Sequence, residues 1–147
     1  MRKIYIVGVL LVAVLLVLGA CAPATTPAPT TIKITAAQLY AEYEANEVAA
    51  DLKYKDKHLE VSGVVTDICA TSQITGKPVI FLAESLDAPF MEGVTVHLSA
   101  DQKVKLATLS KGDSVTVVGI CEGIALVRGT EQFGFRGVRL RDCSIVE

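Results

Sequence analysis

The residues best suited to bind a ligand gather near the C-terminal end of the chain. Every arginine other than Arg2 lies at position 128 or later: Arg128, Arg136, Arg139 and Arg141. Phe133 and Phe135 lie among these arginines. An aromatic ring can stack on a flat group, and a guanidinium binds carboxylates and phosphates. This cluster predicts a ligand-binding surface that includes Arg128, Phe133, Phe135 and Arg136.

Phe81 and His97 are predicted to join this surface from two earlier strands. The alternative is an ordinary solvated strand face with one or two core phenylalanines. His97 alternates with the apolar Val94 and Val96, so we expect its side chain at the protein surface. His58 follows a charged turn, and the same position is expected for it.

No motif in the sequence indicates catalysis. Gly-x-Ser-x-Gly, His-Glu-x-x-His and a phosphate-binding loop are all missing, so the serine hydrolase, metalloprotease and nucleotidase classes find no support. The chain has only two histidines and no Cys-x-x-Cys, which argues against a zinc site. We expect a non-catalytic protein without metal or cofactor.

The first 20 residues have the three parts of a secretory signal. Arg2 and Lys3 precede an apolar stretch from Ile4 to Leu18, and small residues follow before Cys21. The apolar stretch is shorter than the roughly 20 residues that a membrane-spanning helix needs. An uncleaved transmembrane anchor is the alternative. Residues 22–31 are rich in Pro, Thr and Ala, a composition typical of an extended tether.

The run Leu18-Gly19-Ala20-Cys21 resembles the lipobox of bacterial lipoproteins. The resemblance implies cleavage before Cys21, acylation of Cys21, and an anchored protein that faces the periplasm or the exterior. More than one acyl chain makes such anchoring stable. Without Arg2 and Lys3 the chain keeps 12 basic and 16 acidic residues, a net charge of −4. This charge makes nucleic acid an unlikely general partner.

Residues 34–147 are predicted to form one domain, behind a signal (1–20) and a lipidated tether (21–33). Thr35 and Gln38 have capping-box spacing before an amphipathic helix over 36–50. Ser99 and Gln102 predict a second capping box before a short helix over 100–109. Period-two patterns predict five strands, which begin near residues 58, 79, 94, 115 and 138. A phase slip at Gly63 predicts a β-bulge there, and a second slip is predicted near Asp142.

This order of elements predicts a mainly β (α+β) fold, a five-stranded Greek-key OB-fold barrel. It has an N-terminal helix, and a short helix lies between strands three and four. Cys121 and Cys143 fall on the apolar faces of the last two strands, so a disulfide between them is predicted. Two buried thiols are the alternative, and Cys69 is a rival partner for the bridge.

The ordered residues from Ile34 to Glu147 also resemble the tRNA-anticodon-like OB-fold domain family of prokaryotic lipoproteins. Four stretches carry the resemblance: the helix with Leu39, Tyr40 and Tyr43; Leu59 to Val65; Leu109 to Gly123, with Lys-Gly-Asp and Gly-x-Cys-x-Gly; and Leu140 to Ile145. The expected function is a membrane-anchored binding domain that docks an envelope protein, a glycan or a small ligand. Single-stranded nucleic-acid binding is the alternative.

Overall fold

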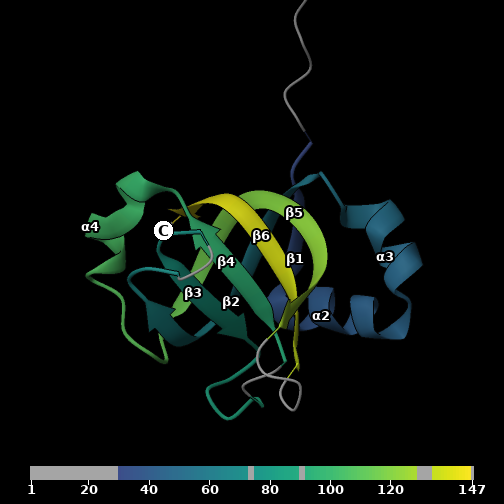
Figure 1. The fold of residues 1–147 in the computed structure, drawn as a ribbon, viewed down its shortest axis with the longest axis horizontal. Helices are drawn as coiled ribbons and strands as arrows, with labels where there is room; N and C mark the ends of the chain where they lie inside the picture. Colours follow the sequence, from purple (N-terminus) through teal and green to yellow (C-terminus); the bar gives the residue numbers. More distant parts are fainter. Residues whose placement is uncertain (1–29, 73–74, 90–91, 129–133, 147) are drawn as a thin grey trace, which may run out of the picture.

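The computed structural model describes residues 30–72, 75–89, 92–128 and 134–146, which fold around one β-barrel (Figure 1). The strands are β1 (Ile32–Thr35), β2 (His58–Cys69), β3 (Val79–Ala83), β4 (Val94–Leu98), β5 (Ser114–Arg128) and β6 (Gly134–Val146). The helices are α2 (Ala36–Ala45), α3 (Glu47–Tyr54), the 3-10 helix η1 (Ala100–Gln102) and α4 (Lys103–Leu106).

Five of the strands close into a mixed barrel. The sheet order is β1-β2-β3-β4-β6-β5, and a further pairing of β2 with β5 closes it. β4 and β6 pair in parallel, whereas the other pairs of the barrel are antiparallel. Together with the leading helices and the short helix before β5, this arrangement confirms the predicted OB-fold.

One strand lies outside the prediction. β1 pairs in parallel with the first half of β2, from Ile32 opposite Leu59 to Thr35 opposite Ser62. Its first residue, Ile32, precedes the predicted start of the domain at residue 34. β1 therefore joins the sheet as an extra strand beside the five of the barrel.

β2 changes partners along its length. One of its edges pairs first with β1 and then with β3, and Gly63 lies between the two pairings. A Cβ at Gly63 would lie 2.9 Å from the Cβ of Ala36, so glycine allows α2 to approach the strand closely. The predicted bulge at Gly63 is wrong, because the register shifts between Val65 and Asp67 instead.

The apolar side chains of the strands fill the barrel interior, as period-two alternation requires. Val61, Val96, Val117 and Leu140 are fully buried. β6 is continuous but irregular at Asp142, which has a positive φ of 52°, and its register against β4 shifts beside this residue. The predicted phase slip near Asp142 is therefore confirmed, since Cys143 and Ile145 return to the interior.

The predicted first helix is two helices. Thr35 and Gln38 form the expected capping box at the start of α2. The chain then breaks at Asn46, whose side chain accepts a hydrogen bond from the Ala49 amide and caps α3. An asparagine is a strong N-cap because its carbonyl oxygen satisfies a free amide, so the single helix over 36–50 is wrong.

The second predicted capping box does not form. Ser99 makes no side-chain capping bond at the start of η1. The Gln102 side chain instead accepts a hydrogen bond from the Ile145 amide of β6, at 3.1 Å. The Gln102 side chain is therefore engaged in a long-range hydrogen bond and is not available for the capping box. The helix that was expected to reach Leu109 ends at Leu106.

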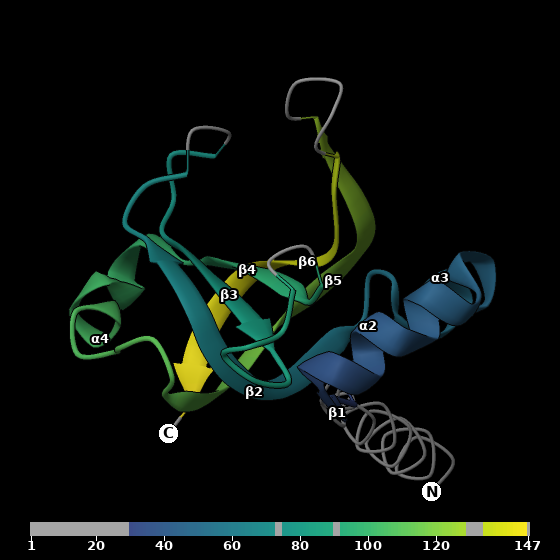
Figure 2. The same cartoon turned by 90° about the horizontal axis from the view of Figure 1, so that it is seen from below.

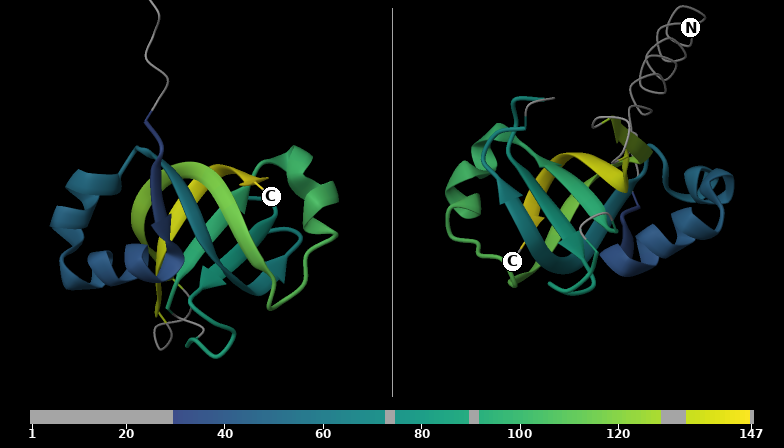
Figure 3. Two further views of the ribbon diagram at one scale, coloured as in Figure 1. Left: turned by 180° about the vertical axis from the view of Figure 1, so that it is seen from behind. Right: turned by 60° about the horizontal axis from the view of Figure 1, so that its bottom comes forward.

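The helices lie on two opposite sides of the barrel. α2 and α3 lie on one side and α4 lies on the other (Figure 3). The far end of β2 and the long β5–β6 hairpin rise on the same side of the molecule, with β4 and β6 between them (Figure 2). Two outer surfaces of the barrel are described below: one over β3, β4 and β6, and one over the pairing of β2 with β5.

Candidate binding face

A row of polar and aromatic side chains crosses four strands on the outside of the barrel. Phe81 of β3 lies opposite Thr95 of β4, and Thr95 lies opposite Arg139 of β6. Arg139 in turn lies 3.8 Å from the Glu122 carboxylate of β5. We call this surface the polar face. It consists of Lys77, Phe81, Thr95, His97, Glu122, Arg139, Arg141 and Asp142.

His97 lies within the polar face but is nearly covered, with 6% of its surface exposed. Its Nδ1 lies 3.2 Å from the hydroxyl of Thr75, in the segment that follows β2. Burial, and next the positive charge of Arg139, lower the pKa of His97, so its imidazole is neutral at pH 7. The predicted surface position of His97 is wrong, because the loop from β2 to β3 covers it.

The charged side chains of the polar face form a chain of ion pairs. Lys77 Nζ lies 3.0 Å from Asp142, and Arg141 lies 3.1 Å from the same carboxylate. Arg141 also lies 3.6 Å from Glu122 and 3.9 Å from Asp56. Lys77, followed by Arg141, lowers the pKa of Asp142. The three cations of the polar face therefore pair with three carboxylates, two on the face (Glu122 and Asp142) and one at its edge (Asp56).

The structure brings only some of the predicted ligand-binding residues to the polar face. Phe81 and His97 lie on it. Arg128, Phe135 and Arg136 lie in the β5–β6 hairpin, where Val127 pairs with Phe135, and their backbones alone are described. Phe133 lies outside the described residues, and so does the proposed lipidation site Cys21.

Sequence reasoning missed Lys77, Glu122, Asp142 and Arg139 as parts of one network. One signal was present, because the phase slip near Asp142 marks a residue that leaves the regular alternation. Such an irregularity turns adjacent side chains to the same surface. The partners of Asp142 were not detectable, since Lys77 lies 65 residues away in sequence.

The cysteines of the domain are free thiols in the structure. Cys121 pairs with Leu140 across the β5–β6 ladder, whereas Cys143 packs against Gly119. Burial raises the pKa of Cys121, and it raises the pKa of Cys143 to about 12. Both are therefore protonated and unreactive. The disulfide between Cys121 and Cys143 is not present and stays a prediction.

A hydrogen-bonded cluster joins Cys121 to the helices. The Tyr43 hydroxyl lies 3.5 Å from the Cys121 sulfur and donates to Asp51 Oδ1 at 3.1 Å. Burial is the largest cause that raises the pKa of Tyr43. The cluster fixes α2 and α3 against β5, and we assign it a structural role.

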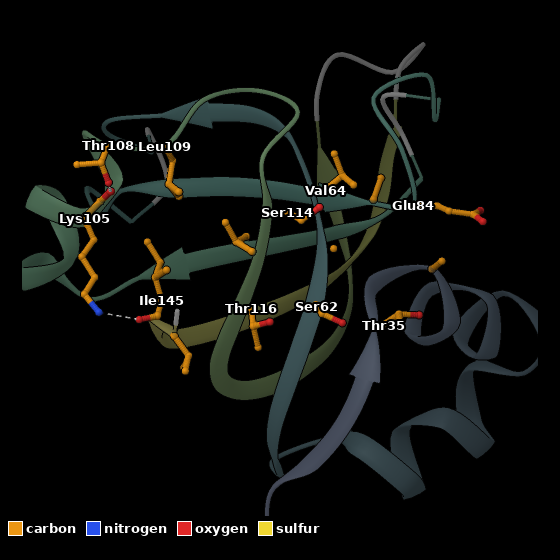
Figure 4. A pocket seen from close by; sticks show the side chains of 15 residues that line it. Thr35, Ser62, Val64, Glu84, Lys105, Thr108, Leu109, Ser114, Thr116 and Ile145 are labelled. Carbon is orange, nitrogen blue, oxygen red and sulfur yellow. Dashed lines mark hydrogen bonds between the residues drawn. The ribbon is translucent and has the colours of Figure 1, made fainter.

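A second surface, the seam groove, lies over the β2–β5 pairing that closes the barrel (Figure 4). Its volume is about 650 Å³, within the range of small-ligand pockets. Its floor includes Ser62 opposite Thr116 and Val64 opposite Ser114. The first turn of α2 and the end of β3 border one side, and α4 with the end of β6 borders the other.

Two features are absent from the described residues. No helix in the described ranges is long and apolar enough to span a membrane. Within the same part of the chain, no group of three or more potential metal-ligating side chains occurs.

Three solved structures are similar to this chain. A Klebsiella pneumoniae lipoprotein described as nucleic acid-binding is 18% identical, with a TM-score of 0.53 over 78% of this chain and 92% of its own. The Stn1–Ten1 complex of S. pombe is 16% identical, with a TM-score of 0.37 over 60% and 57%. An asparaginyl-tRNA synthetase of Entamoeba histolytica is 12% identical, with a TM-score of 0.41 over 81% and 24%.

The similarity to the Klebsiella lipoprotein shows that the two proteins share a fold. No curated protein matches the sequence significantly. The model of the tRNA_anti-like family, however, matches residues 1–130, which is most of the chain. With the barrel and its helices described above, this match identifies the protein as a member of the tRNA_anti-like family of OB-fold binding domains.

Proposed function

We propose that the protein is a non-catalytic, lipid-anchored binding domain that docks another protein of the cell envelope on its polar face. The observation that carries the proposal is the balance of charge on that face. Lys77, Arg139 and Arg141 are all paired with carboxylates at 3.0–3.9 Å. A charge-balanced surface suits a partner of mixed charge, because electrostatic complementarity there selects a partner by pattern.

The rest of the proposal follows from the composition of the face. The half-buried Phe81 supplies an apolar centre, and Arg139 lies on the other side of the nearly covered Thr95. Aromatic and arginine side chains are enriched in protein interfaces. The thiols of Cys121 and Cys143 lie in the barrel interior, and burial raises the pKa of both, so neither supplies a ready nucleophile.

Site-specific crosslinking in intact cells tests the docking partner. A benzoylphenylalanine in place of Lys77, whose side chain is 44% exposed, is expected to give discrete crosslinked species. The matched control places the same group at Lys103, which is exposed on α4 away from the polar face. Charge reversal by Arg139→Glu should abolish the crosslinks from position 77. Equal products from both positions would refute docking on this face.

The lipid anchor rests on the sequence pattern before Cys21. Its test is the intact mass of the protein purified from membranes under non-reducing conditions. We expect a chain that begins at Cys21 and carries acyl chains, and a Cys21→Ser variant that stays unprocessed. A wild-type mass that matches an unmodified chain from Met1 would refute the anchor.

Single-stranded nucleic-acid binding is a second candidate. The similarity to the Klebsiella lipoprotein described as nucleic acid-binding favours it. Phe81 and Arg139, which lie on either side of Thr95, offer a stacking group and a phosphate-binding group. Binding of a labelled oligothymidylate should then weaken steeply as salt rises. The absence of binding at low salt would exclude this candidate and leave the docking proposal intact.

A further inference from the structure

The floor of the seam groove carries hydroxyl groups that are available to a ligand. Among the described residues, no hydrogen bond is made by the hydroxyls of Ser62, Ser114 or Thr116. In contrast, Thr35 caps α2, and the Thr108 hydroxyl donates to the Lys105 carbonyl at 2.7 Å. A hydroxyl both donates and accepts hydrogen bonds. The floor can therefore satisfy a chain of alternating N–H and C=O groups.

Opposite charges mark the two ends of the groove. Lys105 lies at one end and Glu84 lies at the other (Figure 4). The Lys105 ammonium donates to a neutral group, the Ile145 main-chain carbonyl, at 3.1 Å, so it keeps its charge available for an anion. Glu84 is exposed at the end of β3. A ligand that fits both ends carries an acidic group near Lys105 and a basic group near Glu84.

The remaining lining argues for an aliphatic occupant. Val64, Leu109 and Val146 contribute apolar surface, and no aromatic ring occurs among the described lining residues. Nucleobases are usually held by stacking on aromatic side chains, which this groove does not offer. A peptide, in contrast, supplies backbone donors and acceptors for the hydroxyls and carries opposite charges at its two ends.

We propose that the seam groove binds a short extended peptide segment, with its carboxylate end at Lys105 and its amino end at Glu84. This site is separate from the polar face, because β2 and β5 close the barrel on the side away from β4. The proposal therefore goes beyond the docking function. The protein would hold one partner on the polar face and a short peptide with two free ends in the groove.

NMR titration of the full-length protein in detergent micelles tests this site. The probe is an alanine-based pentapeptide with free ends, and its acetylated and amidated form is the neutral counterpart. We expect saturable shifts of the Ser62, Ser114 and Thr116 amides with the free peptide. The neutral counterpart should bind more weakly by about two- to fivefold for each lost charge pair, as for partly exposed ion pairs.

Variants of the two ends make the test specific. Lys105→Gln should weaken the free peptide by about two- to fivefold and leave the amidated peptide unaffected, whereas Lys105→Arg should keep the affinity. Glu84→Gln should likewise weaken the binding of the peptide with a free amino end and leave the acetylated peptide unaffected. Lys103→Gln is the matched control, since Lys103 is exposed on the same helix but does not line the groove.

Three results would overturn the proposal. One is the absence of saturable shifts at roughly 10 mM peptide, a concentration that detects even millimolar affinity. Another is an equal affinity for the free and the neutral peptide. The third is a set of shifts centred on Phe81 and Arg139 instead of the groove. Each of these outcomes leaves the crosslinking test of the polar face unaffected.

Discussion

The polar face and the seam groove are two outer surfaces of the same barrel, and they place their charges in opposite ways. On the polar face, Lys77 and Arg141 both contact the Asp142 carboxylate directly, at 3.0 and 3.1 Å. In the groove, Lys105 and Glu84 stand at opposite ends, with hydroxyls between them. The polar face can therefore recognise a pattern of mixed charge, whereas the groove selects a ligand by the two charges at its ends.

The difference originates in how the strands are interrupted. β6 leaves its regular alternation at Asp142, and this irregularity brings adjacent charged side chains together. β2 instead changes partners at Gly63. The start of α2 lies over this point, and the result is a depression whose floor is uncharged. One barrel thus acquires two kinds of surface through two local departures from regular pairing.

The largest expected effect concerns the barrel that both surfaces share. A Cβ at Gly119 would overlap the Cys143 sulfur and would lie 3.0 Å from the Arg141 carbonyl oxygen. Gly119→Ala should therefore lower the free energy of unfolding by about 1–3 kcal/mol through overpacking, as measured by urea denaturation. The double variant with Cys143→Ala should recover part of this loss. An unchanged urea midpoint would contradict the close packing of β5 and β6.

A smaller effect should show which of the two surfaces binds a nucleic acid, because removal of a carboxylate raises the affinity only where the nucleic acid binds. Glu122→Gln removes the carboxylate that pairs with Arg139 and Arg141, so oligothymidylate affinity at low salt should rise several-fold, because phosphate binding follows local positive charge. Fluorescence anisotropy measures this change. Glu84→Gln alters the net charge equally but lies at the groove, and it should have little effect. Equal increases would show that net charge alone matters.

The smallest effect is the contribution of His97, on the polar face, to the pH dependence of the free energy of unfolding. The pKa of His97 is lowered in the folded protein by burial, and further by Arg139 and Lys77, while Glu122 opposes the shift. Its stabilising contribution is therefore complete above the unfolded value near 6.5 and declines as pH falls below it. Urea denaturation at pH 7.5 and 5.5 should show a smaller difference in His97→Gln than in wild type. Equal differences in His97→Gln and wild type would contradict a contribution from the buried imidazole.

The barrel was predictable because its signals are local. Alternation along the strands, the capping box at Thr35 and the slip near Asp142 each depend on residues that are close in sequence. β1 was missed because four residues behind a proline-rich stretch carry too short a pattern. Asn46 was a detectable cap, since asparagine before an acidic first turn favours a helix start.

The binding surfaces were less predictable because distant segments build them. His97 has the alternation of a surface residue, yet the loop that contains Thr75 covers it. Gln102 fits a capping box, yet it bonds to Ile145. The seam groove takes its lining from α2, α4 and several strands, so no single stretch of sequence indicates it.

The position of β1 also has a mechanical consequence. Any pull on the residues ahead of Thr30 enters the domain through Ile32, and β1 runs parallel to β2. Such a force acts along the strand, so it shears the hydrogen bonds of the four-residue ladder together instead of opening them one by one. β1 would then resist tension until the whole ladder breaks, and its detachment would free the residues ahead of α2 while the five-stranded barrel stays closed.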